Sequence, residues 1–217
     1  MKKLKKKKIG SYFRELSIVI IGVAVTLYAN NLINSINEKK DVKLRLNAVY
    51  AELEDNLHRV EQLIDFYERA CRLRDFLWDY HDHPEMDVSE ETFRQYNAII
   101  NDGYSFFYRK GAYDLFMTNG TMTLFDNKQL ILDITECYEF MEETKSEHDY
   151  FLQLRLEQFK SLYQHDLNYI TGNHKITDPR VRNIYNFYML TIGEQSDIQT
   201  LKERIENILS KKSSNRS

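Results

Sequence analysis

Residues that interrupt helices are scarce in this chain. Only two prolines and seven glycines occur among its 217 residues, and no low-complexity linker divides it. Because the turns of a sheet require such residues at short intervals, their scarcity favours long helices over strands. No segment alternates between apolar and polar residues with a period of two, and we therefore predict an all-α fold.

The chain also lacks the motifs that identify most enzymes. It has no Ser-His-acid arrangement, no glycine-rich phosphate loop and no internal repeat. A di-iron bundle would need two Glu-x-x-His motifs, and Asp55-x-x-His58 approximates only one of them. We therefore expect no enzymatic activity, no catalytic residues and no cofactor.

The N-terminus combines strong positive charge with an apolar run. Six lysines lie within the first eight residues, and the 14-residue run Leu16–Ala29 follows. A helix that crosses a membrane needs roughly 20 apolar residues. Aromatic residues before the run and Leu32-Ile33 after it extend the run to the 22-residue span Tyr12–Ile33. The sequence predicts a single transmembrane helix over residues 12–33, with aromatic residues at the membrane interfaces.

The distribution of charge predicts how this helix is oriented. Residues 1–15 carry a net charge of +6, and because the whole chain carries −3, the residues after them carry −9. Short basic flanks stay on the cytoplasmic side of a membrane. We expect residues 1–11 to form a basic cytoplasmic tail at the lipid bilayer of the inner membrane, and the main domain to be extracytoplasmic, or periplasmic. The acidity of that domain argues against nucleic acid as a partner.

Two other interpretations of the N-terminus remain open. A cleavable signal peptide has the same basic start and apolar core, but Leu27-Tyr28-Ala29 places a leucine where the cleavage site needs a small residue. A buried helix of a soluble protein would be apolar as well. We adopt the uncleaved anchor.

Residues 34–210 are predicted to form one helical-bundle domain, followed by a disordered tail over residues 211–217. The first helix should continue from the membrane span without a break and end near residues 78–80, ahead of Pro84. Its apolar residues recur every three or four positions, which predicts one buried face. Glu52 is assigned to the opposite, solvent-facing side.

Four further helices are expected from the positions of caps and breakers. They are a short helix after Met86 capped by Asp87 or Ser89, a short helix over 111–118, a long helix from the N-cap Asp126 to about Tyr169, and a last helix that begins at Asp178-Pro179.

Two segments of the chain resemble a known family. They are Tyr12-Phe13-Arg14-Glu15-Leu16 with the apolar span that leaves the membrane at Ala29-Asn30-Asn31, and Gly111-Ala112-Tyr113-Asp114-Leu115-Phe116 with Leu124-Phe125 downstream. On these residues the chain resembles uncharacterised single-pass bacterial membrane proteins that share a domain of unknown function. The resemblance implies an N-terminal anchor and an all-helical outer domain, but no activity and no site residues. The chain departs from the pattern at Leu32-Ile33, where the family often has a tryptophan.

The densest group of potential metal ligands is Asp79-Tyr80-His81-Asp82-His83. Imidazole and carboxylate groups bind zinc and copper, but this segment has no distant partner residues. We expect a solvated turn, and the sequence leaves open whether His81 and His83 bind metal. Cys71 and Cys137 lie on apolar faces, and buried thiols are favoured over a disulfide, for which the two Cα atoms would have to approach closely.

Aromatic residues and one histidine are expected in the core. His148 lies on the apolar face of its helix, so a core or boundary position is favoured over a catalytic one. The run Tyr104–Tyr108 is favoured as core rather than as a ligand platform.

The predicted function is that of a membrane-tethered helical interaction or scaffold module, which binds a protein partner or forms a homo-oligomer. Gly22 and Thr26, four residues apart, form a small-xxx-small pair that lets two membrane helices approach closely. The alternative is a ligand-sensing helical domain, since aromatic pockets between helices hold small molecules. Because only residues 1–11 are predicted in the cytoplasm, a sensor would act through a partner membrane protein.

Overall fold

The computed structural model describes residues 2–83, 85–101, 104–118, 125, 127–163 and 196–214. All regular structure in these ranges is helical, which confirms the predicted fold class. The helices are α1 (Lys2–Asp82), α2 (Glu90–Asn101), α3 (Gly111–Thr118), α5 (Lys128–Tyr163) and α8 (Ser196–Ser214). The predicted end of the fourth helix near Tyr169 and the start of the last at Asp178-Pro179 lie outside the described residues.

The helix α1 runs without interruption through 81 residues. At a rise of about 1.5 Å per residue it is about 120 Å long. Neither glycine nor proline occurs between Gly22 and Pro84, so nothing in this stretch breaks the ladder of backbone hydrogen bonds. The predicted continuity from the apolar run into the first helix of the domain is confirmed. The helix ends at Asp82, two residues beyond the predicted range.

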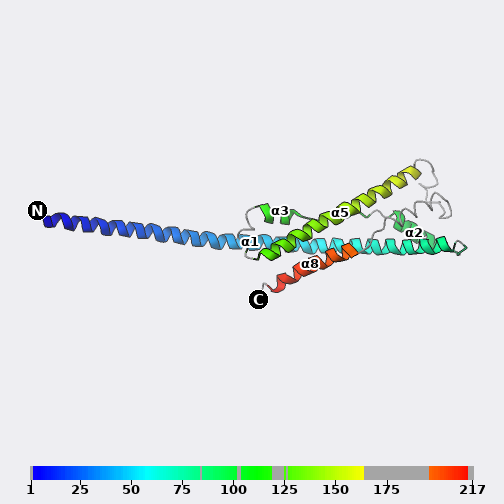
Figure 1. The fold of residues 1–217 in the computed structure, drawn as a ribbon, viewed down its shortest axis with the longest axis horizontal. Coiled ribbons are helices and arrows are strands. Elements are labelled where there is room, and N and C mark those ends of the chain that lie inside the picture. Colours follow the sequence, from blue (N-terminus) through cyan, green and yellow to red (C-terminus); the bar gives the residue numbers. More distant parts are fainter. Residues whose placement is uncertain are drawn as a thin grey trace.

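The other helices pack along the C-terminal half of α1, and its N-terminal half projects away from them (Figure 1). Tyr138 of α5 contacts Glu52, and His148 of α5 contacts Tyr67, so α5 runs parallel to α1. Lys212 and Lys202 of α8 pair with Glu54 and Glu61, so α8 runs antiparallel. The most deeply buried side chains of this core are Val49, Leu53, Val60, Leu63, Phe106, Phe116, Leu130, Ile134, Met141, Leu201 and Ile205.

Short polar side chains begin two of the helices. The Ser89 hydroxyl accepts a hydrogen bond from the backbone N–H of Thr92 at 3.1 Å, so Ser89 and not Asp87 caps α2. Asn127 accepts from the N–H of Leu130 at 3.1 Å and caps α5. The predicted N-cap Asp126 lies outside the described residues.

The C-terminal end of α8 corrects one prediction. The sequence predicts a disordered tail from residue 211 onward, but α8 continues through Ser214. The Lys211 ammonium lies 2.6 Å from Asp133 of α5, and Lys212 lies 2.7 Å from Glu54 of α1. These two ion pairs hold the last turn of α8 against its neighbours, so the helical domain extends beyond residue 210.

Lys211→Met tests this contact through its dependence on pH. The hydrogen bonds from Lys211 and Gln129 lower the pKa of Asp133. The pKa of an aspartate in the unfolded chain is about 3.9. Because the pKa of Asp133 is lower in the folded protein, this contact stabilises the fold above about pH 3.9, and the stabilisation is lost as the pH falls through the folded-state pKa. We expect Lys211→Met to lower the free energy of unfolding by roughly 0.5 kcal/mol at pH 7. This difference should vanish at pH values below the folded-state pKa of Asp133.

Urea unfolding of the full chain in detergent, followed by circular dichroism between pH 7 and about pH 2, measures this difference. Lys39→Met, in the exposed stretch of α1, is the control and should leave the unfolding free energy unchanged at every pH. A deficit for Lys211→Met that persists unchanged in acid would contradict the role of Asp133.

Candidate functional site

Residues 16–41 of α1 form a long exposed surface in the described part of the chain. Every residue from Leu16 to Asp41 is exposed, and the first buried residue is Val42. Soluble proteins rarely expose apolar patches of more than a few hundred Å² unless the patch contacts a membrane or a partner. The exposed apolar side chains of the run are Leu16, Ile18, Val19, Ile20, Ile21, Val23, Val25, Leu27, Leu32 and Ile33.

This surface is also the candidate membrane span. Among the described residues, one helix is long and apolar enough to cross a bilayer, and none of the side chains in its apolar window is buried. A buried helix of a soluble protein would pack these side chains against other elements. The exposure therefore contradicts the buried-helix interpretation for this part of the chain.

A polar site on α1 holds the segment that leads into α3. The Asn56 side chain, which is fully buried, accepts from the Arg109 N–H at 2.8 Å and donates to the Arg109 carbonyl at 2.7 Å. Glu52 accepts from the backbone N–H groups of Ala112 and Tyr113 at 2.9 and 3.1 Å. A carboxylate at a helix N-terminus interacts favourably with the helix dipole, so Glu52 caps α3 from a different helix.

Tyr138 of α5 also contacts Glu52 at the start of α3. The Tyr138 hydroxyl donates to Glu52 at 2.8 Å. Burial, and after it the bond to Glu52, raises the pKa of Tyr138. Burial likewise raises the pKa of the neighbouring Cys137 thiol to about 12. Both groups therefore stay protonated at neutral pH, and the Glu52 oxygens are occupied by three donors, so this arrangement is structural.

His148 lies in the core, as predicted, and is surrounded by aromatic rings. Its Nε2 lies 2.8 Å from the Tyr104 carbonyl, and its Nδ1 lies 3.3 Å from the Tyr67 hydroxyl. A carbonyl only accepts, so Nε2 donates to Tyr104, and Nδ1 shares a hydrogen bond with the Tyr67 hydroxyl. Phe66 packs edge-on against the imidazole with ring centroids 5.9 Å apart. Both nitrogens are thus used to fix α5 to α1 and to the 104–110 segment.

A small cavity borders this cluster. It has a volume of about 310 Å³ and is lined by Tyr67, Thr144, Glu147, His148, Phe151 and the first turn of α8. The Thr144 hydroxyl donates to its own helix, to the Phe140 carbonyl at 2.8 Å. The cavity lining therefore combines the aromatic residues Tyr67 and Phe151 with the carboxylates Glu147 and Asp197.

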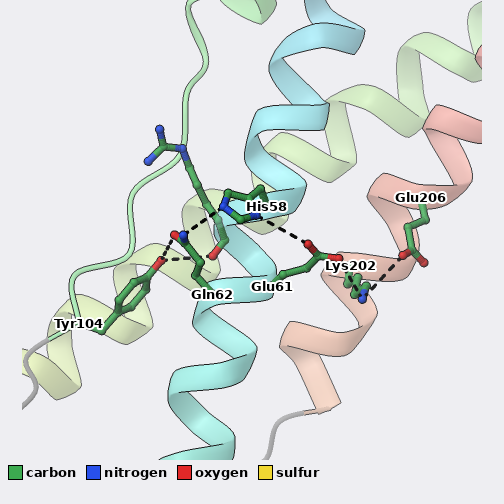
Figure 2. A network of polar contacts seen from close by, with 7 residues as sticks. His58, Glu61, Gln62, Tyr104, Lys202 and Glu206 are labelled. Carbon is green, nitrogen blue, oxygen red and sulfur yellow. Dashed lines mark hydrogen bonds and ion pairs between the residues drawn. The ribbon is translucent and has the colours of Figure 1, made fainter.

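Surface polar contacts fix the register of α8 along α1 (Figure 2). Lys202 lies 3.3 Å from Glu61 of α1 and 3.9 Å from Glu206 of its own helix. His58, in turn, lies 3.9 Å from Glu61 and 3.2 Å from the Gln62 amide. Exposed contacts of this kind contribute little individually, and their role is to orient the helices.

The half-motif Asp55-x-x-His58 is not assembled as a metal site. Asp55 forms an ion pair of 2.7 Å with Arg109, whereas His58 contacts Gln62 and Glu61. His83 lies after the end of α1 and is 3.6 Å from Glu85. In the part of the chain that the structure describes, no three His, Cys, Asp or Glu residues are grouped so as to hold a metal ion.

The cysteines and the aromatic run behave largely as predicted. Cys71 and Cys137 are thiols, Cys137 buried and Cys71 partly so. Cys137 adjoins Tyr138, which contacts Glu52, and position 71 is about 28 Å further along α1, far beyond the reach of a disulfide. In the aromatic run Phe106 is buried, whereas Phe107 is exposed beneath the Arg59 guanidinium, 4.2 Å from its ring centroid.

Comparisons of the chain with protein-family models, with curated proteins and with solved structures find no match. The resemblance to single-pass bacterial membrane proteins with a domain of unknown function therefore stays a prediction.

Asn56→Ala tests the polar site on α1. The substitution removes the buried Asn56 amide and leaves the partly buried N–H and carbonyl of Arg109 without this partner, and we expect a loss of about 2 kcal/mol in unfolding free energy. Asn207→Ala, at an exposed position of α8, is the matched control and should change the value by less than about 0.5 kcal/mol. Equal effects of the two substitutions in denaturant titrations would contradict the assignment.

Proposed function

We propose that the chain is a single-pass membrane protein whose helical domain is an interaction or scaffold module without enzymatic activity. The observation that carries the proposal is the exposure of every residue from Leu16 to Asp41 on a helix that continues into the core of the domain. Each buried CH₂ group gains about 0.8 kcal/mol on leaving water, so a bilayer around this run removes a large unfavourable term.

The proposed orientation follows from charge. The lysine-rich residues 1–11 lie on the cytoplasmic side of the inner membrane, and the domain is extracytoplasmic, or periplasmic. Between Ile33 and Val42 the helix is polar and exposed over about 13 Å. The domain would thus begin just outside the lipid headgroups and extend away from the membrane along α1.

The interaction role is supported by what the described side chains do. Glu52, Asn56 and His148, three polar groups of the described domain, are engaged in holding its helices and loops together. Burial holds Cys137 and Tyr138 in their protonated, unreactive forms. A repeated failure to recover any protein partner by crosslinking in membranes, with the chain monomeric, would contradict this role.

The second candidate is a ligand-sensing domain that acts through a partner membrane protein. The cavity of about 310 Å³ beside Tyr67 and His148 favours it. A screen of small molecules by thermal shift separates the two functions, because only a sensor should be stabilised by a ligand. Loss of that stabilisation in a Phe151→Ala variant would place the ligand in this cavity.

The double variant Ile20→Arg/Val23→Arg tests the anchor. Each arginine at the centre of the span costs about 3 kcal/mol on insertion, so the protein should move from the carbonate-resistant membrane fraction to the soluble fraction. Leu132→Arg/Leu156→Arg, at exposed positions of α5, adds the same charge outside the span and should remain in the membrane. Retention of both variants in the membrane fraction would contradict the anchor.

Protease added to intact spheroplasts tests the orientation. The proposed topology places residues 34–214 outside, so the protease should degrade the domain and leave a short membrane-embedded N-terminal fragment. A tag on the N-terminus should stay protected until the membrane is permeabilised. Protection of the domain together with loss of the tag would reverse the orientation without affecting the anchor itself.

A further inference from the structure

One side of α1 stays open from the membrane span into the helical domain. At 3.6 residues per turn, a set of residues between positions 22 and 51 falls within an arc of about 80° on the helix surface. All of them are exposed. This set, called the open face below, consists of Gly22, Thr26, Ala29, Ile33, Asn37, Lys40, Leu44, Asn47 and Ala51.

The other helices of the domain border the open face but do not cover it. α8 contacts α1 on one side through Glu54, and α3 contacts it on the other side through Arg45 and Glu52. Leu44, on the face, is 68% exposed although it lies level with the start of the core. The described part of the domain therefore leaves this strip of α1 uncovered.

Packing within the single chain does not explain why a glycine stands at position 22 of the open face. A Cβ atom added to Gly22 would meet no other atom within 4 Å. Glycine inside a helix costs roughly 0.5–1 kcal/mol relative to alanine, so a glycine here is unfavourable for an isolated helix. In membranes, glycine and other small residues allow two helix backbones to approach closely. The benefit of Gly22 lies outside the single chain.

The dimensions of the face select the kind of partner. From residue 22 to residue 51 it is about 44 Å long, and with a helix width of about 10 Å it would bury roughly 900 Å² on two helices together. Stable complexes between soluble proteins bury roughly 1,200–2,000 Å² in total, so this area is too small for such a complex. It is sufficient only for a partner already concentrated and aligned in the same membrane, where the effective concentration is high.

The pattern along the face selects a second copy of the chain. The face consists of small and apolar residues to Ile33, is polar at Asn37 and Lys40, and then carries Leu44, Asn47 and Ala51. A partner must repeat this order at the same depths, and an identical chain with the same topology does so. Two such chains are related by a two-fold axis along the membrane normal, which brings each residue of the face to its own counterpart.

The asparagines of the face fit this symmetric arrangement. From Asn37 to Ala51 the residues of the face are spaced alternately by three and four positions, which is the spacing of the contact positions in a coiled coil. A polar residue at an a position of a coiled coil specifies the register and the number of helices, at a cost in stability, and Asn37 occupies such a position. The amide of Asn47 has both a donor and an acceptor, so two copies of it can form a hydrogen bond with each other across the axis.

We propose that two copies of the chain pair in parallel along the open face of α1. The inference rests on the proposed membrane anchor and names the partner of the interaction module. Small residues at both ends of the face permit close approach, and Leu44 supplies the largest apolar contact outside the membrane. Lys40 is the one charged residue on the face, and the two copies of it lie at the polar level of Asn37, where their flexible stems reach water.

Adjacent lysines provide a matched test by cysteine crosslinking. Lys40 lies on the open face, and Lys39 lies on the far side of the helix at the same depth; both are exposed. In membranes treated with copper–phenanthroline, two thiols lose two electrons and two protons to the oxidant and form a disulfide. We expect a dimer of twice 26.0 kDa on non-reducing gels for Lys40→Cys and for Ala51→Cys, and its absence for Lys39→Cys and for the natural chain.

The outcomes of this experiment are distinct. No dimer for Lys40→Cys and Ala51→Cys, or equal dimer for Lys39→Cys, overturns the pairing. Each sample is also separated into membrane and soluble fractions. Recovery of the protein in the soluble fraction would overturn the proposed anchor, and with it the pairing, whereas a monomer in the membrane fraction would overturn the pairing and leave the anchor intact.

Leu44→Glu gives a second readout in which no disulfide forms. It places a short charged side chain opposite its own copy across the two-fold axis, where it cannot reach water as the long stem of Lys40 does. Labelled copies of the natural chain should therefore show energy transfer to each other in lipid vesicles, as expected for a dimer, and copies of Leu44→Glu should not. Leu132→Glu, at a 52% exposed position of α5, should stay dimeric. Circular dichroism identical to that of the natural chain shows that the variants fold. A dimeric Leu44→Glu, or a monomeric natural chain, overturns the proposal.

Discussion

The unbroken backbone ladder of α1 is the constraint on which the remaining structure depends. One helix carries both the exposed apolar run and the residues of the core, so the orientation of one determines that of the other. α2, α3 and α8 all contact α1. If a glycine or proline stood between Ile33 and Val42, the helix could kink there and the domain would no longer be held in line with the span. Its absence makes α1 a rigid support about 120 Å long.

Polar side chains hold the 104–110 segment, which apolar packing along α1 alone does not fix. The 104–110 segment is not helical, so its partly buried backbone groups need side-chain partners. Asn56 supplies both hydrogen bonds of Arg109, and His148 binds the Tyr104 carbonyl. Glu52 then begins α3 with its carboxylate. The three side chains come from α1 and α5, and together they hold the segment between these helices.

Features that follow from local sequence are predictable here, and those that depend on distant partners are not. Gly111 and the breakers after Thr118 predict the helix between them, and the apolar period predicts α1. Glu52, by contrast, is assigned to solvent by its position on the helix, because its partners lie 60 residues away. The local sequence likewise places Lys211 in a disordered tail, because its partner, Asp133, belongs to another helix. Periodicity identifies the faces of a helix, but not what covers them.

The two uncovered regions of α1 differ in what they require. The apolar run over residues 16–33 consists mainly of large side chains that water solvates poorly, and the proposed bilayer would remove this cost. Beyond the membrane the open face has one large apolar residue, Leu44, and the polar or small residues Asn47 and Ala51, so its exposure costs little. Pairing along this part gains little free energy unless the membrane has already aligned the chains. The proposed anchor would therefore make a weak helix face sufficient for association and would leave that association reversible.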